Sequence, residues 1–294
     1  MKRKIHEYLS RQYMLSTDYE IYHYSNNDIA RISLHHHDFY ECYFFISGDV
    51  TYLIEGKTYY LKPGDIILIN SKELHQAIIN NKEIPYERIV LWLDKSFLNK
   101  LSTEEINLSC CFENLDRKNV LRLDIELQQN IKTLLIKLLN LENYNGIGRE
   151  LLYKSYITEI MVYINNLVFN EEAHLDNDIK KNNLIDEIID YINNHINEDI
   201  TIDELAEHFY LSKFHLLREF KKFTGTTIHR YIVQKKLIQA KELILNGIPI
   251  IDVYKQCGFG DYSNFFRAFK NEYGLTPKQF YKAMYNKINQ VDVK

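Results

Sequence analysis

Four side chains in the first third of the chain have the types and spacing of a metal or ligand site. His35, His37 and Glu41 differ by even numbers of residues, so a regular β-strand would project all three to one face. His75 follows a second predicted strand. Two imidazoles, a carboxylate and a distant imidazole suit a divalent metal such as zinc, iron or manganese. The alternative is that these groups hydrogen-bond one another in a metal-free pocket that binds an organic effector.

A different chemistry, contact with double-stranded DNA, is indicated in the last third of the chain. Side chains three and four residues apart share one helix face, and a major groove admits one such face. Arg218 and Arg267 stand on two such predicted faces, where an arginine can pair with a guanine edge. The residues predicted to read bases are Phe214, Leu217, Arg218, Tyr262, Ser263, Phe266 and Arg267. The residues predicted to bind phosphates are Lys213, Lys221, Lys222, Lys235 and Lys270.

The first of these faces belongs to a helix-turn-helix predicted between Thr201 and Gly225. Thr201 or Asp203 can cap a short helix, and Ser212 can cap the next helix after a break at 209–211. The predicted core positions of that second helix are Leu216 and Phe220.

A second helix-turn-helix is predicted after a long connecting helix over 226–246. Its first helix covers 250–256, its turn 257–260, and Asp261 caps its second helix. The predicted core positions are Phe265 and Phe269. Both motifs contain the pattern Arg-x-Phe-Lys, and this internal repeat predicts that one chain inserts two helices into DNA.

The distribution of charge supports this interpretation more than its sum does. The formal net charge is -4. The stretch from Leu184 to Glu207 holds eight carboxylates and no Lys or Arg, whereas the stretch from Lys213 to Lys241 holds eight cations and one carboxylate. We therefore expect a phosphate-facing surface backed by an acidic one.

Short apolar runs separated by turn residues fill the region 31–93. The runs are YECYFFIS, VTYLIE, TYYL, DIILIN and ERIVLWL. Five or more β-rich segments at this spacing predict a sandwich or a small barrel. Residues 1–30 have no clear period and predict an arm or a leading strand.

The pattern changes to a helical one after residue 120. Apolar residues recur by threes and fours in two segments, which predict a helical hairpin over 121–170. Leu135 and Leu139 widen the first apolar stripe, so we expect a subunit interface there, with packing onto the barrel as the alternative.

The predicted fold class is α+β and multidomain. We expect a ligand-binding β-barrel over 1–120, the hairpin over 121–170, a mixed-charge linker over 171–183 and an all-α domain with two helix-turn-helix motifs over 184–294.

Other features narrow the class of protein. The four cysteines have no CxxC spacing and are typical of reduced cytoplasmic thiols. The sequence has neither an export signal nor an apolar run long enough to span a membrane. We therefore expect a cytoplasmic protein that has no membrane partner. Walker, Rossmann and Gly-x-Ser-x-Gly patterns do not occur either, which argues against ATP, NAD and serine hydrolase chemistry.

The first domain resembles the cupins. HHHDFYECYFFISG keeps the H-x-H-x3-E-x6-G spacing, and Gly64 and His75 keep the separation found in the second cupin motif. Asn70, Lys72 and Ile79 stand where that motif has Pro, Gly and Asn, so the resemblance supports the barrel more than the metal. A cupin-type metal oxygenase or isomerase is the runner-up interpretation.

Residues 184–285 resemble the DNA-binding domain of the AraC/XylS family. LSKFHLLREFKKFTG, the tail GFGDYSNFFRAFKNEYGLTPKQF and their separation carry the resemblance. Lys236, Tyr254 and Tyr281 depart from the family's usual Arg, Ala and Arg. The resemblance implies a transcription factor, not an enzyme, whose partners are DNA, a small-molecule effector, RNA polymerase and, as a hypothesis, a second copy of the chain.

Overall fold

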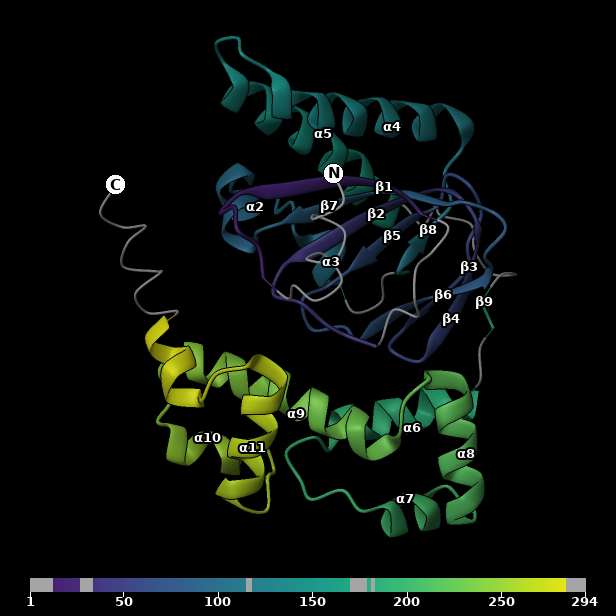
Figure 1. The fold of residues 1–294 in the computed structure, drawn as a ribbon, viewed down its shortest axis with the longest axis vertical. Helices are drawn as coiled ribbons and strands as arrows, with labels where there is room; N and C mark the ends of the chain where they lie inside the picture. The colour runs from purple at the N-terminus through teal and green to yellow at the C-terminus, as the bar shows by residue number, and fades with distance from the viewer. Residues whose placement is uncertain (1–12, 27–33, 115–117, 170–178, 181–182, 284–294) are drawn as a thin grey trace. The chain divides into compact units, whose positions relative to one another are not determined.

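A computed structural model describes residues 13–26, 34–114, 118–169, 179–180 and 183–283 of the chain. The chain divides into two compact units, Met1–Lys181 and Asn182–Lys294. The first unit contains the sheets and the second is helical, so the predicted fold class is confirmed (Figure 1).

Two antiparallel sheets form the first unit. One has the strand order β1-β7-β2-β5-β8 and the other β6-β3-β4-β9. The strands of the first sheet are Tyr19–Asn26, Tyr86–Leu93, Tyr40–Ser47, Ile66–Ile69 and Val120–Leu121, in that order. Those of the second are His75–Asn81, Asp49–Ile54, Lys57–Tyr60 and Ile179–Lys180.

The five predicted apolar runs correspond to β2, β3, β4, β5 and β7. A tight turn with left-handed Glu55 and Gly56 joins β3 to β4, as expected for a two-residue hairpin. Most of the predicted linker lies outside the described residues, but its Ile179–Lys180 pair with Tyr59 and Thr58 as β9. The sequence pattern of β9 is too short to predict a strand by itself.

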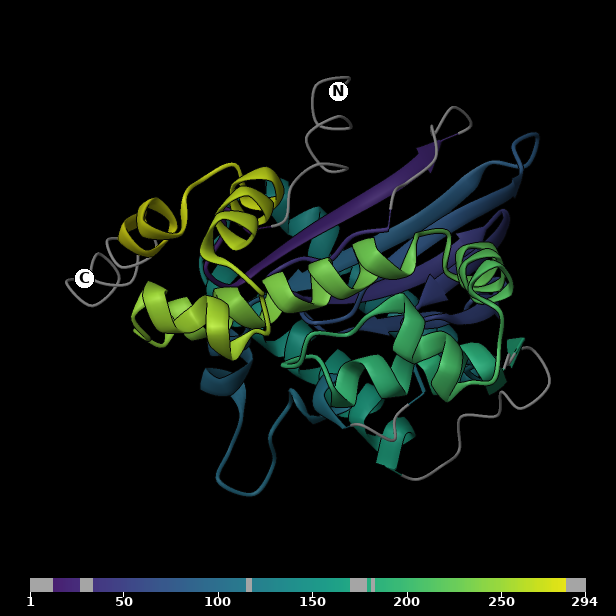
Figure 2. The same ribbon diagram turned by 90° about the horizontal axis from the view of Figure 1, so that it is seen from below.

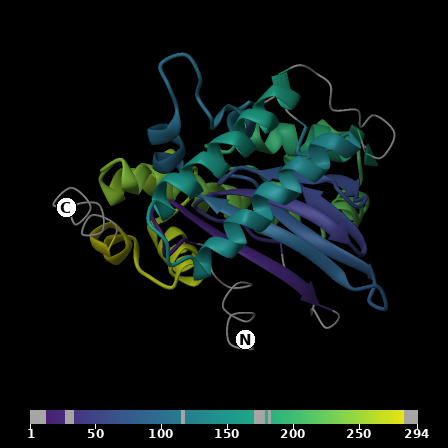
Figure 3. The ribbon, with the colours of Figure 1, turned by 90° about the horizontal axis from the view of Figure 1, so that it is seen from above.

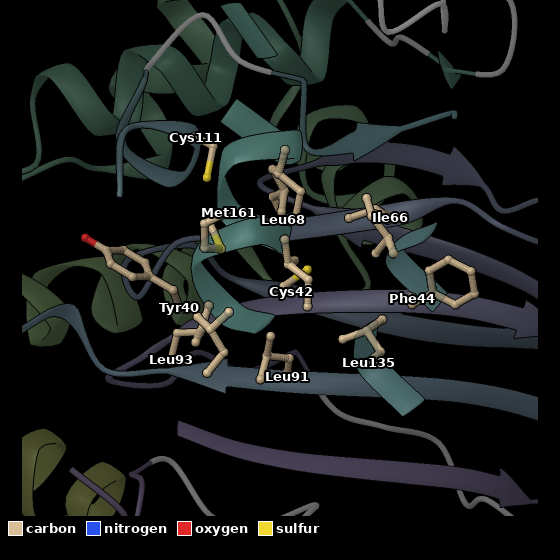
Figure 4. Packing of buried hydrophobic residues seen from close by; sticks show 14 of the residues in the cluster. Tyr40, Cys42, Phe44, Ile66, Leu68, Leu91, Leu93, Cys111, Leu135 and Met161 are labelled. Carbon is tan, nitrogen blue, oxygen red and sulfur yellow. The ribbon is translucent and has the colours of Figure 1, made fainter. Parts of the chain in front are cut away.

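Strand β2 is buried on both faces, which separates two apolar clusters. Its even-numbered Tyr40, Cys42 and Phe44 join one cluster with the helices of the hairpin (Figure 4). Its odd-numbered Tyr43 and Phe45 join the other cluster, between the two sheets. Because alternate residues of a strand face opposite sides, Glu41 belongs to the side of the second cluster.

Helices cover the outer face of the first sheet. The hairpin consists of α4 (Ile125–Asn140), a short 3-10 turn (Leu141–Asn143) and α5 (Arg149–Phe169), and it runs across the sheet (Figure 3). The shorter helices α2 (Lys95–Leu101) and α3 (Cys110–Glu113) complete this layer.

At Leu135 and Leu139 the structure favours the alternative, packing within the unit, over the expected subunit interface. Leu135 is 1 % exposed and lies in the same cluster as Met161 of α5 (Figure 4). Leu139 packs against that cluster. The stripe is wide because α4 contacts two neighbours, the sheet and α5, so both edges of the stripe are used inside the unit.

In the second unit, the described residues form six helices and a further helical segment. They are α6 (Asn183–Asn194), α7 (Ile202–His208), α8 (Lys213–Thr224), α9 (Ile228–Leu245), α10 (Ile250–Gln256), α11 (Tyr262–Tyr273) and helical residues 277–283. The long helix α9 connects α7 and α8 at one end with α10 and α11 at the other (Figure 2). Both predicted helix-turn-helix motifs are present.

Within the described parts of the chain, every helix is too short or too polar to cross a lipid bilayer.

Candidate nucleic-acid interface and buried histidine site

Side-chain caps fix both helices of the first motif. The Thr201 hydroxyl accepts a hydrogen bond from the Glu204 backbone N–H, and the Glu204 carboxylate accepts one from the Thr201 N–H. Thr201, not Asp203, is therefore the cap of α7. The Ser212 hydroxyl accepts from the backbone N–H of His215 at 3.2 Å, as predicted for the cap of α8.

Helix α8 has one buried face and one exposed face. Leu216 and Phe220 are fully buried, while Phe214 is 73 % exposed and Leu217 is also exposed. The Arg218 guanidinium lies on the exposed face, 3.3 Å from Glu219 Oε1 and 3.3 Å from His215 Nδ1. These contacts orient the guanidinium without burying it.

The turn between α7 and α8 presents an exposed aromatic residue that is absent from the predicted set of DNA contacts. Tyr210 has φ of +54°, its N–H donates to Glu207 O, and its side chain is 96 % exposed. A left-handed non-glycine residue costs roughly 1–2 kcal/mol. The signal in the sequence was an aromatic residue at a position where glycine is usual.

The second motif repeats this arrangement. The Asp261 carboxylate accepts from the Asn264 N–H at 2.8 Å and caps α11, and Phe265 and Phe269 are fully buried. The predicted base-reading residues on the other face are Tyr262, Ser263 and Arg267, all exposed, and the half-buried Phe266. The Tyr254 ring lies edge-on to Tyr262, with centroids 5.8 Å apart, so its bulk is accommodated between α10 and α11.

The five predicted phosphate-binding lysines differ in their surroundings. Lys221 and Lys270 are exposed near the ends of α8 and α11. Lys213 forms an ion pair with Asp203 of α7, and Lys222 lies 3.6 Å from Glu219. Lys235 is half-buried.

Two cations of the basic stretch do not belong to a phosphate-facing surface, contrary to the sequence prediction. Lys236 is 5 % exposed, and its Nζ donates to two backbone carbonyl groups. Lys241 is also buried, with Nζ 5.5 Å from the centre of the Tyr273 ring, and burial lowers the pKa of Lys241 to about 8. Both lie on α9, which is packed between the two motifs. A count of charges along the sequence cannot show that these two lysines are buried.

The histidine site lies at the edge of the cluster between the two sheets. His37, Glu41 and His75 are buried, and one ligand atom from each lies within 4.8 Å of the others. The His37 Nε2 and Glu41 Oε2 atoms are 3.4 Å apart. The Trp92 indole N–H donates to Glu41 Oε2 at 2.9 Å.

Backbone contacts fix the orientation of two imidazole rings. His37 Nδ1 lies 2.9 Å from Phe39 O, and His75 Nδ1 lies 3.0 Å from Glu73 O. A carbonyl oxygen only accepts, so both Nδ1 atoms carry protons and the Nε2 atoms face the site. Among the described residues, His75 Nε2 has no hydrogen-bond partner.

The site's protonation states follow from burial and neighbouring charge. Burial, together with the nearby His35 and His37, holds the pKa of His75 well below its usual range. Burial would raise the pKa of Glu41, but the His37 hydrogen bond and the neighbouring His37, His35 and Trp92 lower it overall. Glu41 is therefore an anion in a site whose His75 is neutral.

The predicted regular strand through His35, His37 and Glu41 is wrong. The chain bends at residues 38–39, and β2 begins at Tyr40. His35 instead forms an isolated bridge with His75, which follows β5 as predicted and is the first residue of β6. The His35 and His75 rings are 4.2 Å apart, but His35 is not in the group of converging ligand atoms.

Comparison with known protein families identifies both units. The model of an AraC-like ligand binding domain matches residues 18–159, and that of a helix-turn-helix domain matches residues 205–283. The chain belongs to the AraC family of transcriptional regulators.

Relatives of known sequence extend over most of this AraC-family chain. The uncharacterised HTH-type transcriptional regulator YbfI of Bacillus subtilis is 26% identical over 78% of this chain and 80% of its own. The HTH-type transcriptional activator RhaS of Mannheimia succiniciproducens is 26% identical over 83% of this chain and 87% of its own. Among solved structures, the C-terminal domain of the response regulator yesN from Fusobacterium nucleatum is 31% identical, with a TM-score of 0.33, and covers 34% of this chain and 99% of that domain.

In the ligand-binding domain of this AraC-family protein, the sequence did not predict that Trp92 is a partner of Glu41. Trp92 lies directly opposite Glu41 in the pairing of β2 with β7. Its place in the run ERIVLWL predicts a strand residue, but only the register of the two strands brings its indole to the carboxylate.

Proposed function

We propose that this AraC-family regulator inserts α8 and α11 into successive major grooves of duplex DNA, under the control of a small molecule bound by the first unit. The duplicated geometry carries the proposal. Arg218 and Arg267 each stand exposed two residues before a buried phenylalanine on a capped helix. Equivalent positions on two recognition helices suit one protein that reads two grooves on the same side of DNA.

We assign base contacts to the exposed faces of α8 and α11 and phosphate contacts to their lysines. The base-reading set is Phe214, Leu217, Arg218, Tyr262, Ser263, Phe266 and Arg267. The phosphate-binding set is Lys213, Lys221, Lys222, Lys235 and Lys270. Lys213 must exchange Asp203 for a phosphate, so its contribution is smaller than that of the exposed Lys221. Tyr210 adds an exposed hydroxyl beside α8.

The test is selection of duplexes from a random pool by the full-length protein, followed by footprinting. We expect two protected major grooves on one side of the helix, about 34 Å apart. Affinity should fall steeply as salt rises, because lysine contacts release counterions from phosphates. Selection of no sequence, or binding that does not change with salt, would contradict the proposal.

For the first unit, we propose that His37, Glu41 and His75 bind either a divalent metal or a polar group of the effector. The unpartnered Nε2 of His75 and the facing His37 Nε2 and Glu41 Oε2 atoms support this. A proton on His37 Nε2, or a cation between His37 Nε2 and Glu41 Oε2, would balance the charge of the buried carboxylate. Two imidazoles and a carboxylate fit zinc, iron or manganese, and a bound ion would supply positive charge for an effector's oxygen atoms.

Metal analysis of the purified protein distinguishes these two versions of the site. Stoichiometric metal that is lost in Glu41→Ala supports the metal centre. An organic molecule found by native mass spectrometry, without metal, supports the metal-free pocket. We propose binding without chemistry, and substrate turnover with metal would instead favour an oxygenase or isomerase.

The remaining partners are proposed from the family and from the helical hairpin. RhaS is named a transcriptional activator, and we propose contact with RNA polymerase and activation in the cytoplasm. The outward face of α4, which includes Ile125 and Ile136, is the proposed homodimer contact in place of the buried Leu135.

A further inference from the structure

Lys236 connects the two helix-turn-helix motifs through the middle of α9. Its Nζ donates to Glu198 O at 2.8 Å and to Gly258 O at 2.6 Å. Glu198 lies in the segment before α7, and Gly258 lies in the turn between α10 and α11. One side chain therefore holds the segment that leads into the first motif to the turn of the second.

Gly258 brings the same two segments into direct contact. Its φ is +67°, and a Cβ atom added to it would lie 2.6 Å from both C and O of Asn197 and 2.8 Å from Glu198 O. These are backbone atoms, which cannot move aside as a flexible side chain would. Gly247 also has a positive φ, of +80°, but a Cβ atom there would meet nothing within 4 Å. The close approach is therefore a property of the junction and not of left-handed glycines in general.

Each motif also has a core of its own. In the second motif, Phe265 and Phe269 pack with Val253 and the C-terminal half of α9. In the first motif, Phe220 packs edge-on against Tyr231 near the start of α9, with ring centroids 5.6 Å apart. The motifs are thus joined by α9 and by the contacts of Lys236 and Gly258 with residues 197–198.

The chemistry of Lys236 suits a bridge of this kind. Burial lowers the pKa of its ammonium group, while Asp199 acts in the opposite direction. A buried ammonium group is stabilised only when its protons reach good acceptors, and two carbonyl oxygens supply them here. The Phe259 ring, 5.9 Å away, adds a cation–π contact.

We propose that Lys236 and Gly258 fix the separation of α8 and α11, and thereby set the spacing between the two DNA half-sites that the protein accepts. This inference rests on the proposed reading of two grooves. Lys236 acts as a positioning residue, because it is buried and reaches backbone groups of the protein. With the junction broken, a bend in α9 would let each recognition helix meet its groove at a range of spacings.

The test compares full-length variants on duplexes of altered spacing. The probe is a duplex of about 40 base pairs selected from a random pool by the wild-type protein, with one or two base pairs then inserted between the half-sites. Each insertion rotates one groove away from the other, so the wild-type dissociation constant should rise by about tenfold or more.

Lys236→Met and Gly258→Ala should each weaken binding to the original duplex by about tenfold and reduce the insertion penalty to about twofold. Lys236→Arg keeps a cation with several donors and should retain the wild-type penalty. Gly247→Ala is the matched control, because it adds the same methyl group at a left-handed position in open space. It should also behave as the wild type does.

A direct distance measurement keeps the inference testable if DNA binding is lost. Spin labels placed on α8 and α11 by Lys222→Cys and Lys270→Cys should give a narrow distance distribution, which broadens in Gly258→Ala but not in Gly247→Ala. Circular dichroism should show unchanged helix content in each variant. Distance distributions of equal width in the two glycine variants would contradict the proposed role of the junction. So would a Lys236→Met protein that loses as much affinity as the wild type when base pairs are inserted. If the wild-type protein selects no duplex, while the distance distribution still broadens in Gly258→Ala, the proposed function is overturned and the mechanical role of the junction stands.

Discussion

Arg218 and Lys222 lie one turn apart on α8, but their expected roles in binding differ. An arginine paired with a base edge adds affinity only on the correct sequence, whereas a lysine near phosphates adds it on every sequence. Both contact Glu219 in the free protein, so each must exchange that carboxylate for DNA.

We expect Arg218→Ala to cost about 1–3 kcal/mol on a selected duplex and little on random DNA. Lys222→Ala should weaken both duplexes equally and lower the salt dependence by about one ion. Fluorescence anisotropy titrations at several salt concentrations measure both effects. Equal losses on selected and random DNA for Arg218→Ala would refute base reading at that position.

Lys241 should make the stability of the second unit depend on pH. Its folded pKa is about 8, against 10.5 for an ordinary lysine. Between those values the unfolded chain keeps a proton that the folded chain has released, so the free energy of unfolding rises with pH. Well below pH 8 Lys241 is charged in both the folded and the unfolded chain, so its contribution to the free energy of unfolding does not change with pH.

The expected rise is about 1.5 kcal/mol between pH 8 and about pH 9.5. Lys241→Met should remove this rise and increase stability at pH 7. Urea denaturation of both proteins at each pH measures the difference. A rise of the same size in Lys241→Met would assign it to other groups.

The sequence predicted the burial of individual residues better in the second unit than their contacts in the first. Helical periodicity placed Phe265 and Phe269 in the core and Arg267 outside it, because one helix face decides both. The same periodicity could not show that Lys236 and Lys241 are buried, since their burial depends on how two motifs pack around α9. The contact of Trp92 with Glu41 depends on strand register, which residue spacing alone does not determine.

At the scale of elements, two recognition helices begin at caps of different chemistry. Ser212 caps α8 and Asp261 caps α11, each by accepting a bond from the N–H three residues later. Capping turns out to be well predicted from sequence, because it depends on neighbours in the chain. The bend before β2 was not predicted, because even spacing of polar residues indicates a strand only where the backbone stays extended.

Removing either cap should destabilise its own motif. We expect Ser212→Ala and Asp261→Ala each to cost about 1 kcal/mol, while Ser212→Thr and Asp261→Asn should retain most of the stability. Thermal unfolding followed by circular dichroism gives the comparison. Alanine variants as stable as the wild type would show that other contacts start these helices.

At the scale of the whole molecule, the α4–α5 hairpin packs onto the first sheet and leaves its outer face to solvent or to a partner. Leu135 and Ile136 are neighbours on α4, but the first is 1 % exposed and the second 42 %. Substitutions at these two residues therefore distinguish the contribution of the hairpin to folding from its proposed contribution to dimerisation.

Leu135→Ala should lower the free energy of unfolding by about 2–5 kcal/mol, because it leaves a cavity between α4, α5 and the sheet. Ile136→Ala, the matched control, should change it by roughly 0.5 kcal/mol or less. Denaturant melts provide both values. Similar values for the two variants would contradict this packing.

Ile136→Glu then tests the proposed dimer. If the outer face of α4 joins two copies, a carboxylate there should give a monomer by sedimentation while leaving the fold intact. A wild-type protein that is monomeric at micromolar concentration, with and without DNA, would end the dimer hypothesis.

Trp92 is the one tryptophan of the chain, and its indole donates to Glu41 inside the histidine site. Its emission therefore provides an intrinsic optical signal for that site. An ion or molecule that displaces the indole from the carboxylate changes the spectrum, whether or not the natural effector is known. The second unit has no such chromophore. A change in emission when DNA is added would consequently report communication from one unit to the other, in unlabelled protein.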